Sequence, residues 1–256
     1  MLRFTNTPLI KFFFSSFLFL FFLYGGKLES NKIRADYDIE WNKINLGNIV
    51  WNISINNQDE YEFFLKIKNS DFFSSLYPFY GEYYSTGNVI KSAFIPTKYY
   101  HKWKTKKKNN FVQITFNNNE INNFNIIPKP NNAPYLNFYQ LQDTRDPLSA
   151  ALELIINDDK RIIKNVFDGR RTYELSTNEK FKKKININNN ILSGNYHNLE
   201  INNYKNVWKD HNNKDLKKVE IVTSEIVEGL ILPINFKIIN KGLIIRIRYK
   251  NHQIIN

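Results

Sequence analysis

The chain of 256 residues contains no cysteine, and this absence excludes disulfide bridges, thiolate metal sites and a lipoprotein anchored through cysteine. Only four histidines are present, His101, His197, His211 and His252, and no two have the spacing of metal ligands on one element. The phosphate-binding glycine loop, the dinucleotide fingerprint and the G-x-S-x-G elbow are also missing. The sequence therefore predicts no metal site, no cofactor and no catalytic residue.

No apolar run is long enough for a typical membrane-spanning helix. The longest run, residues 12–24, falls short of the roughly twenty residues that such a helix needs. Arg3 and Lys11 precede it, and small residues follow at Gly25, Gly26 and Ser30. This layout predicts a secretory signal over residues 1–30 and export to the periplasm, followed by one β-rich domain over residues 31–256. Because no clean cleavage site is present, an uncleaved, membrane-associated N-terminal segment is the alternative.

Positive charge is in clear excess, with a formal net charge of +12. Such a charge suggests a polyanionic partner, although the abundance of Lys, Asn, Ile, Phe and Tyr also follows from A/T-rich codons. An exported protein rarely meets nucleic acid, so we expect no nucleic-acid partner. The candidate partner is an anionic envelope component such as lipid, lipopolysaccharide or cell-wall phosphate.

Alternation of apolar and polar residues predicts β-strands along most of the chain. Short connections between them indicate antiparallel neighbours, because parallel strands need longer crossovers. Turns are expected at residues 45–47 and 86–88, where glycine occurs. Pro233 suggests an edge position or a bulge. The later part of the chain is divided by Asn and Gly into predicted strands over residues 182–187, 191–192, 196–201, 204–208, 218–227, 230–240 and 243–250.

A helix signal and a hairpin signal meet in residues 146–175. Asp146 is a good N-cap and Pro147 suits the first helical position, so a helix is predicted to about residue 156, with Ser149 completing the cap. A strand over residues 161–167 then leads to Asp168-Gly169, a dipeptide typical of tight hairpin turns.

Two groups of side chains are candidate binding sites. Asp168, Arg170 and Arg171 could form an anion-binding claw at the hairpin tip. The alternative is structural, with the turn made by Asp168-Gly169 and one arginine paired to a carboxylate such as Glu174 or Asp146.

The second group lies in the basic peak of the sequence, residues 99–108. Here Lys102, Trp103 and Lys104 could contact phosphates and stack on rings. The alternative is a hairpin whose lysines face solvent and protect a sheet edge from pairing with other chains.

The D-P-L-S-A run at residues 146–150, followed by V-F-D-G-R-R-T-Y-E-L at residues 166–175, resembles the hallmark of an exported bacterial family, domain of unknown function 3108. Weaker similarity extends through residues 94–104 and 229–242. Members of that family often carry cysteines beside the D-G-R-R hairpin, and this chain has none, so any bridge there is absent. The resemblance implies a periplasmic all-β protein, with a curved sheet similar to the half-barrel of lipoprotein carriers, and no known reaction.

These observations predict an all-β, mainly antiparallel fold, a bent sheet or open half-barrel with one central α-helix on its concave side. Aromatic residues make up 16% of the chain and occur on nearly every predicted strand. The leading functional hypothesis is therefore a non-enzymatic envelope protein that binds a hydrophobic or amphipathic ligand, such as lipid, or an envelope partner. The alternatives are an enzyme acting on envelope glycan or lipid, and a structural or assembly protein of the envelope.

Overall fold

In the computed structural model, the described residues are 23–24, 32–56, 58–76, 78–156, 162–187, 190–208, 218–227, 230–240 and 243–255. Within them, fifteen strands form one sheet. The strands are β1 (Leu23–Tyr24), β2 (Lys32–Trp41), β3 (Ile44–Ile55), β4 (Glu60–Asn69), β5 (Phe79–Ile90), β6 (Ala93–Thr105), β7 (Asn109–Asn117), β8 (Glu120–Ile127), β9 (Thr144–Arg145), β10 (Ile163–Phe167), β11 (Arg171–Ile187), β12 (Asn190–Asn206), β13 (Lys218–Val227), β14 (Leu230–Asn240) and β15 (Leu243–Ile255). The helices are α2 (Asp71–Leu76), α3 (Pro147–Ile156) and the 3-10 turn η1 (Phe138–Gln140).

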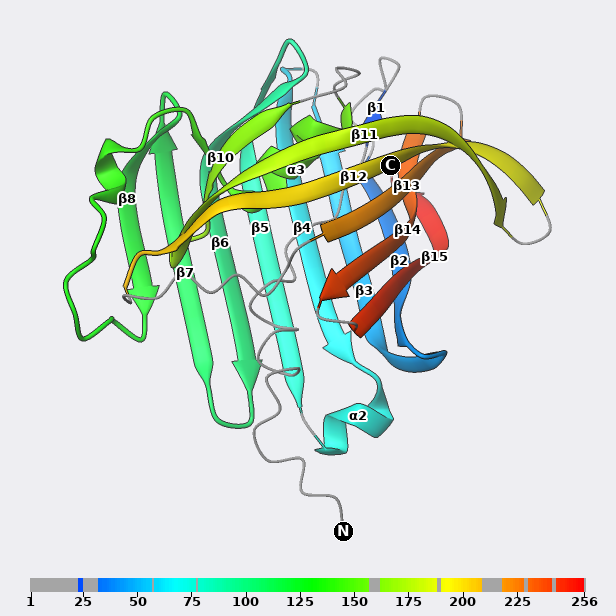
Figure 1. Cartoon of the computed structure of the whole chain (residues 1–256), viewed down its shortest axis with the longest axis horizontal. Coiled ribbons are helices and arrows are strands. Elements are labelled where there is room, and N and C mark those ends of the chain that lie inside the picture. The colour runs from blue at the N-terminus through cyan, green and yellow to red at the C-terminus, as the bar shows by residue number, and fades with distance from the viewer. Residues whose placement is uncertain are drawn as a thin grey trace.

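The sheet consists of two sequential halves joined by the pairing of β2 with β15. β2 to β8 form an antiparallel meander, and β10 to β15 form a second one. In Figure 1 the second half crosses in front of the first, so that the sheet bends into a nearly closed barrel. β9 and β10 are parallel, because α3 connects them as a crossover. The predicted fold, all-β and mainly antiparallel with a central helix, is confirmed.

The core lies between these two halves and contains α3 (Figure 1). Inward-facing residues alternate along the strands, as they do in β2. Among them, Tyr37, Trp51 and Phe63 form a chain of edge-to-face ring contacts and are fully buried. The described residues of α3 are also buried, which explains why this short helix is apolar on nearly all sides.

Two predicted turns are wrong, and both errors involve glycine. β5 continues through Gly87 to a turn at Lys91-Ser92, and β3 runs through Gly47 after a turn at Asn42-Lys43. These four turn residues have positive φ, which suits a two-residue hairpin. A Cβ atom at Gly87 would lie 1.9 Å from the carbonyl oxygen of Ile95. Glycine is therefore needed inside the strand, where the next backbone approaches closely.

The second half has fewer and longer strands than the sequence predicts. β11 and β12 have 17 residues each and join segments that Asn and Gly appeared to separate. Pro233 pairs with Thr223 beside a register shift, so the predicted bulge is confirmed, and the pairing of β14 with β15 begins only at Asn235. The short helix α2 precedes Pro78.

The predicted signal, residues 1–30, lies outside the described residues apart from Leu23–Tyr24, and it stays a prediction. None of the described helices combines the length and hydropathy needed to span a membrane.

Candidate functional site

The start of α3 is fixed by Asp146. One carboxylate oxygen, Oδ1, accepts the backbone N–H groups of Leu148 and Ser149 at 2.8 and 3.1 Å. The Ser149 hydroxyl donates to the carbonyl of Asp146 at 3.1 Å, and Pro147 is the first residue of the helix. The predicted cap is therefore confirmed.

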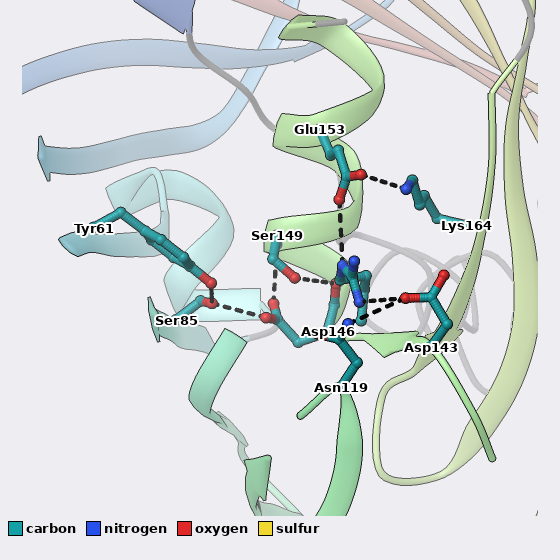
Figure 2. Close-up of polar contacts among 9 residues, drawn as sticks. Tyr61, Ser85, Asn119, Asp143, Asp146, Ser149, Glu153 and Lys164 are labelled. Atoms are coloured by element: carbon teal, nitrogen blue, oxygen red, sulfur yellow. Dashed lines mark hydrogen bonds and ion pairs between the residues drawn. The ribbon is translucent and has the colours of Figure 1, made fainter. Parts of the chain in front are cut away.

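The other oxygen of Asp146 connects the helix to the sheet (Figure 2). It accepts the Ser85 hydroxyl of β5 at 2.8 Å, and Ser85 is 2.9 Å from the Tyr61 hydroxyl of β4. All three side chains are buried. Burial raises the pKa of Asp146, while its hydrogen bonds act in the opposite direction. Both carboxylate oxygens have protein donors, so this group is a structural acceptor.

A buried ion cluster holds the middle of α3 (Figure 2). Glu153 accepts from Arg145 Nε at 3.2 Å and also pairs with Lys164 of β10. Arg145 in addition contacts Asp143 at 2.9 Å. Both Arg145 and Glu153 are 3% exposed. This cluster was not predicted from the sequence, although a lone Glu in an otherwise apolar helix indicates a buried, paired carboxylate.

At the hairpin tip, Asp168 forms the turn itself. Its Oδ1 accepts the backbone N–H groups of Arg170 and Arg171 at 2.8 and 2.7 Å, and its Oδ2 pairs with the guanidinium of Arg171 at 3.2 Å. Gly169 has φ +89°, as a turn glycine should. The predicted arginine–carboxylate pair therefore exists within the turn, whereas Glu174 and Asp146 are not the partners found.

The tip packs against the first half of the sheet. A Cβ atom at Gly169 would lie 2.3 Å from Val112 of β7. Arg170 donates to the Asn110 side chain at 3.2 Å, and the Trp208 indole donates to the carbonyl of Gly169 at 3.1 Å. An aromatic cluster surrounds this contact: Phe124, Phe138, Phe167 and Trp208. The D-G-R-R tip thus helps to close the barrel between its two halves.

Buried titratable groups lie near this tip. His101 of β6 is within hydrogen-bonding distance of the Tyr99 hydroxyl, with Nδ1 at 3.0 Å. Burial, together with the nearby Arg170 and Arg171 and against the opposing effect of Asp168, lowers the pKa of His101 to about 4. The imidazole is therefore neutral at pH 7. Perturbed pKa values are common at active sites, but here His101 contacts Tyr99 and Asp168 pairs with Arg171.

The basic peak on β6 does not form one converging site. Trp103 faces inward and packs against the core, while Lys102 and Lys104 face solvent on the other side of the strand. β6 lies between β5 and β7, so these lysines do not protect a sheet edge. Within the described ranges, no three His, Asp or Glu side chains gather as metal ligands would.

A second basic segment lies at the far end of β11, and it was not among the predicted sites. Lysines occur at positions 180, 182, 183 and 184, and residues 182–184 are exposed. The sequence does indicate this basic segment, because no Asp or Glu occurs among residues 180–199. The segment was overlooked because this part of the chain was predicted as several short strands and not as one long hairpin.

The model of the family described as "Protein of unknown function (DUF3108)" matches residues 36–220. The chain belongs to the DUF3108 family. The match includes the D-P-L-S and D-G-R-R motifs, so the family predicted from these residues is confirmed. In the DUF3108 chain, both motifs join α3 and the second half of the sheet to the first half.

Among solved structures, this DUF3108 chain is similar to a β-barrel-like protein of domain of unknown function DUF1849 from Brucella abortus. The TM-score is 0.54 at 10% identity, over 90% of this chain and 100% of that chain. At this identity the similarity concerns the fold alone. The search of curated proteins finds no match.

Proposed function

We propose that this DUF3108 protein is exported to the cell envelope and works there by binding, without catalysing a reaction. Its ligand would be hydrophobic or amphipathic, or an anionic component of the envelope. Export is supported by Arg3, Lys11 and the apolar run of residues 12–24.

The main support for this proposal is that the carboxylates of Asp146 and Asp168 are used for contacts within the protein. Asp146 caps a helix with one oxygen and binds Ser85 with the other. Asp168 binds two backbone N–H groups with one oxygen and Arg171 with the other. A general base or nucleophile needs an oxygen within reach of a substrate, and these oxygens already have donors. This arrangement disfavours the alternative of a glycan- or lipid-cleaving enzyme built on these motifs.

The position of the aromatic residues also restricts where a ligand could bind. The largest inward-facing side chains are fully buried in the core and pack against one another. The ligand would therefore bind on the outer surface, or it would have to displace packed side chains. Exposed apolar side chains such as Phe72, Phe181 and Ile191 offer contacts on that surface.

The test is native mass spectrometry, with lipid extraction, on the full chain purified from the envelope fraction of its host. A lipid or another amphiphile that co-purifies in fixed stoichiometry is the expected result, and its mass gives the ligand class. The intact protein mass also shows whether residues 1–30 are removed. Recovery of the protein from the cytosol, with no bound molecule, would contradict the proposal.

A parallel assay addresses the enzyme alternative. Envelope glycan and lipid are incubated with the full chain and with an Asp168→Asn variant. Turnover that is lost in the variant, while the variant stays folded, would replace binding by catalysis as the function.

A further inference from the structure

The distal parts of β11 and β12 form a two-stranded ribbon that projects beyond the barrel. Residues 182–187 of β11 pair with residues 190–195 of β12. β13 pairs with β12 only from Gly194 onward, so within the described chain residues 190–193 pair with β11 alone. Figure 1 shows the ribbon extending past the sheet on the side away from β8. We call these residues, 182–187 and 190–193, the ribbon.

The ribbon is basic on one face and carries an exposed apolar side chain there. Lys182 and Lys184 alternate along β11 and therefore share a face, which also holds Ile191 through its pairing with Asn186. Ile191 is 71% exposed. The ribbon itself contains no carboxylate, because residues 180–199 contain no Asp or Glu.

The base of the ribbon adds an aromatic pair on the opposite face. Phe181 stacks on Tyr196 with ring centroids 4.5 Å apart and is still 51% exposed. Lys183 lies over the Tyr196 ring at 5.5 Å. Lysines next to exposed aromatic and aliphatic side chains match the interface of a bilayer, where anionic headgroups lie above acyl chains.

We infer that the ribbon is a docking element for the surface of a bilayer that contains anionic lipid. Lys182 and Lys184 contact the headgroups, and Ile191 on the same face enters the interface. This inference rests on the proposed function in one respect, namely that the protein resides in the envelope. Each lysine near an anionic surface contributes electrostatic attraction. This attraction is lost when the charge is removed and becomes weaker as the salt concentration rises.

The end of the apolar N-terminal run lies beside the base of the ribbon. Leu23 of β1 pairs with Ile231 of β14, and the next residue of β14, Leu232, pairs with Ser224. Ser224 in turn pairs with Gly194 of β12. Leu23 and Tyr24, the described end of this run, therefore lie at the end of the sheet from which the ribbon projects.

The absence of cysteine makes a direct test simple. Ile191→Cys in the full chain carries an environment-sensitive fluorophore, and Phe72→Cys on α2 is the matched control, since the two native side chains are 71% and 70% exposed. Figure 1 places α2 at the lower end of the sheet, away from the ribbon, which extends to the right. Vesicles of phosphatidylcholine with phosphatidylglycerol are compared with vesicles of phosphatidylcholine alone. The expected result is a blue shift at position 191 with anionic vesicles only, and none at position 72.

Charge variants test the lysines. Lys182→Gln with Lys184→Gln should weaken the partitioning onto anionic vesicles by roughly 30-fold, from about fivefold for each lysine. Lys102→Gln with Lys104→Gln, which removes the same charge from β6, should change it only a few-fold. Circular dichroism confirms that both variants are folded.

Three outcomes would overturn the inference: no shift at position 191, equal shifts at both positions, or equal loss in both lysine pairs. Binding of soluble inorganic phosphate without vesicle binding would do the same. A failure here leaves the proposed function open to the co-purification test, because a ligand bound elsewhere would still be detected. Conversely, a cytosolic and empty protein would overturn the proposed function even if the ribbon bound vesicles.

Discussion

At single residues, the clearest constraint is the space left for glycine inside strands. Gly87 has the backbone of Ile95 against it, so a Cβ atom would overlap a carbonyl oxygen that no side-chain rotation can move. We expect Gly87→Ala to lower the free energy of unfolding by about 3 kcal/mol, because β6 must shift away from β5. Urea unfolding followed by circular dichroism measures the change.

Gly81 in the same strand is the control. Its nearest neighbours are ring atoms of Tyr83 and Phe79 at 3.1 to 3.3 Å, and rings can move slightly. Gly81→Ala should therefore cost about 1 kcal/mol. Equal losses at Gly81 and Gly87 would show that the backbone approach at Gly87 is not what selects glycine.

Two buried histidines make stability depend on pH. Burial lowers the pKa of His101 to about 4 and that of His197 to about 3, where Lys180 adds to the effect. Both stay neutral in the folded protein, whereas in the unfolded chain they take up protons below about pH 6.5. The unfolded state thus binds more protons, and stability falls as the pH drops from 6.5 toward 4. By pH 5 each histidine should cost up to about 2 kcal/mol relative to pH 7.5.

The measurement for the histidines is urea unfolding at pH 7.5 and pH 5. A variant with His101→Asn and His197→Asn should lose less stability between these two values than the natural chain. Burial raises the pKa of Asp146, and this contribution has the opposite sign at lower pH, so the comparison stops at pH 5. An unchanged slope in the double variant would assign the pH dependence to other groups.

At the level of elements, α3 is attached to the sheet through Glu153. This carboxylate lies between Arg145 and Lys164 and is 3% exposed. Glu153→Gln leaves the buried guanidinium of Arg145 with less compensation, so we expect a loss of about 3 kcal/mol in unfolding free energy. The less buried counterpart is Glu220, which is 20% exposed and bridges Lys218 and Lys237. Glu220→Gln should cost less than about 1 kcal/mol, and similar costs for the two variants would contradict a structural role for the buried cluster.

Elements with a local signal could be predicted, and elements defined by a neighbour could not. β2 and α3 follow from alternation and from the Asp146-Pro147 start, both of which are properties of adjacent residues. Gly87 and Gly47 were misread because their role depends on a strand that comes later in the chain. The turn at Lys91-Ser92 was not predicted, because these two residues adopt positive φ only where the paired strands hold them in a hairpin.

At the scale of the whole molecule, closure of the barrel explains which part of the site was predictable. The Asp168-Gly169 turn is local, and the sequence indicated it correctly. Its contacts with Val112 and Asn110 join residues about sixty positions apart, and no local pattern reveals them. The parallel pairing of β9 and β10, with Thr144 donating to the carbonyl of Asn119, likewise depends on how the two halves meet.

The same architecture predicts uneven local stability. β3 and β4 have partners on both sides and bury alternate residues, whereas the ribbon is a two-stranded extension with few buried side chains. Isolated two-stranded ribbons are marginally stable in water, so amides of residues 182–187 should exchange hydrogen many-fold faster than those of residues 61–67. Hydrogen exchange with mass spectrometry on the full chain measures both segments at once. Anionic vesicles should slow exchange in the ribbon and leave residues 61–67 unchanged. A ribbon as protected as β4 in free protein would show that it packs against something and is not free to dock.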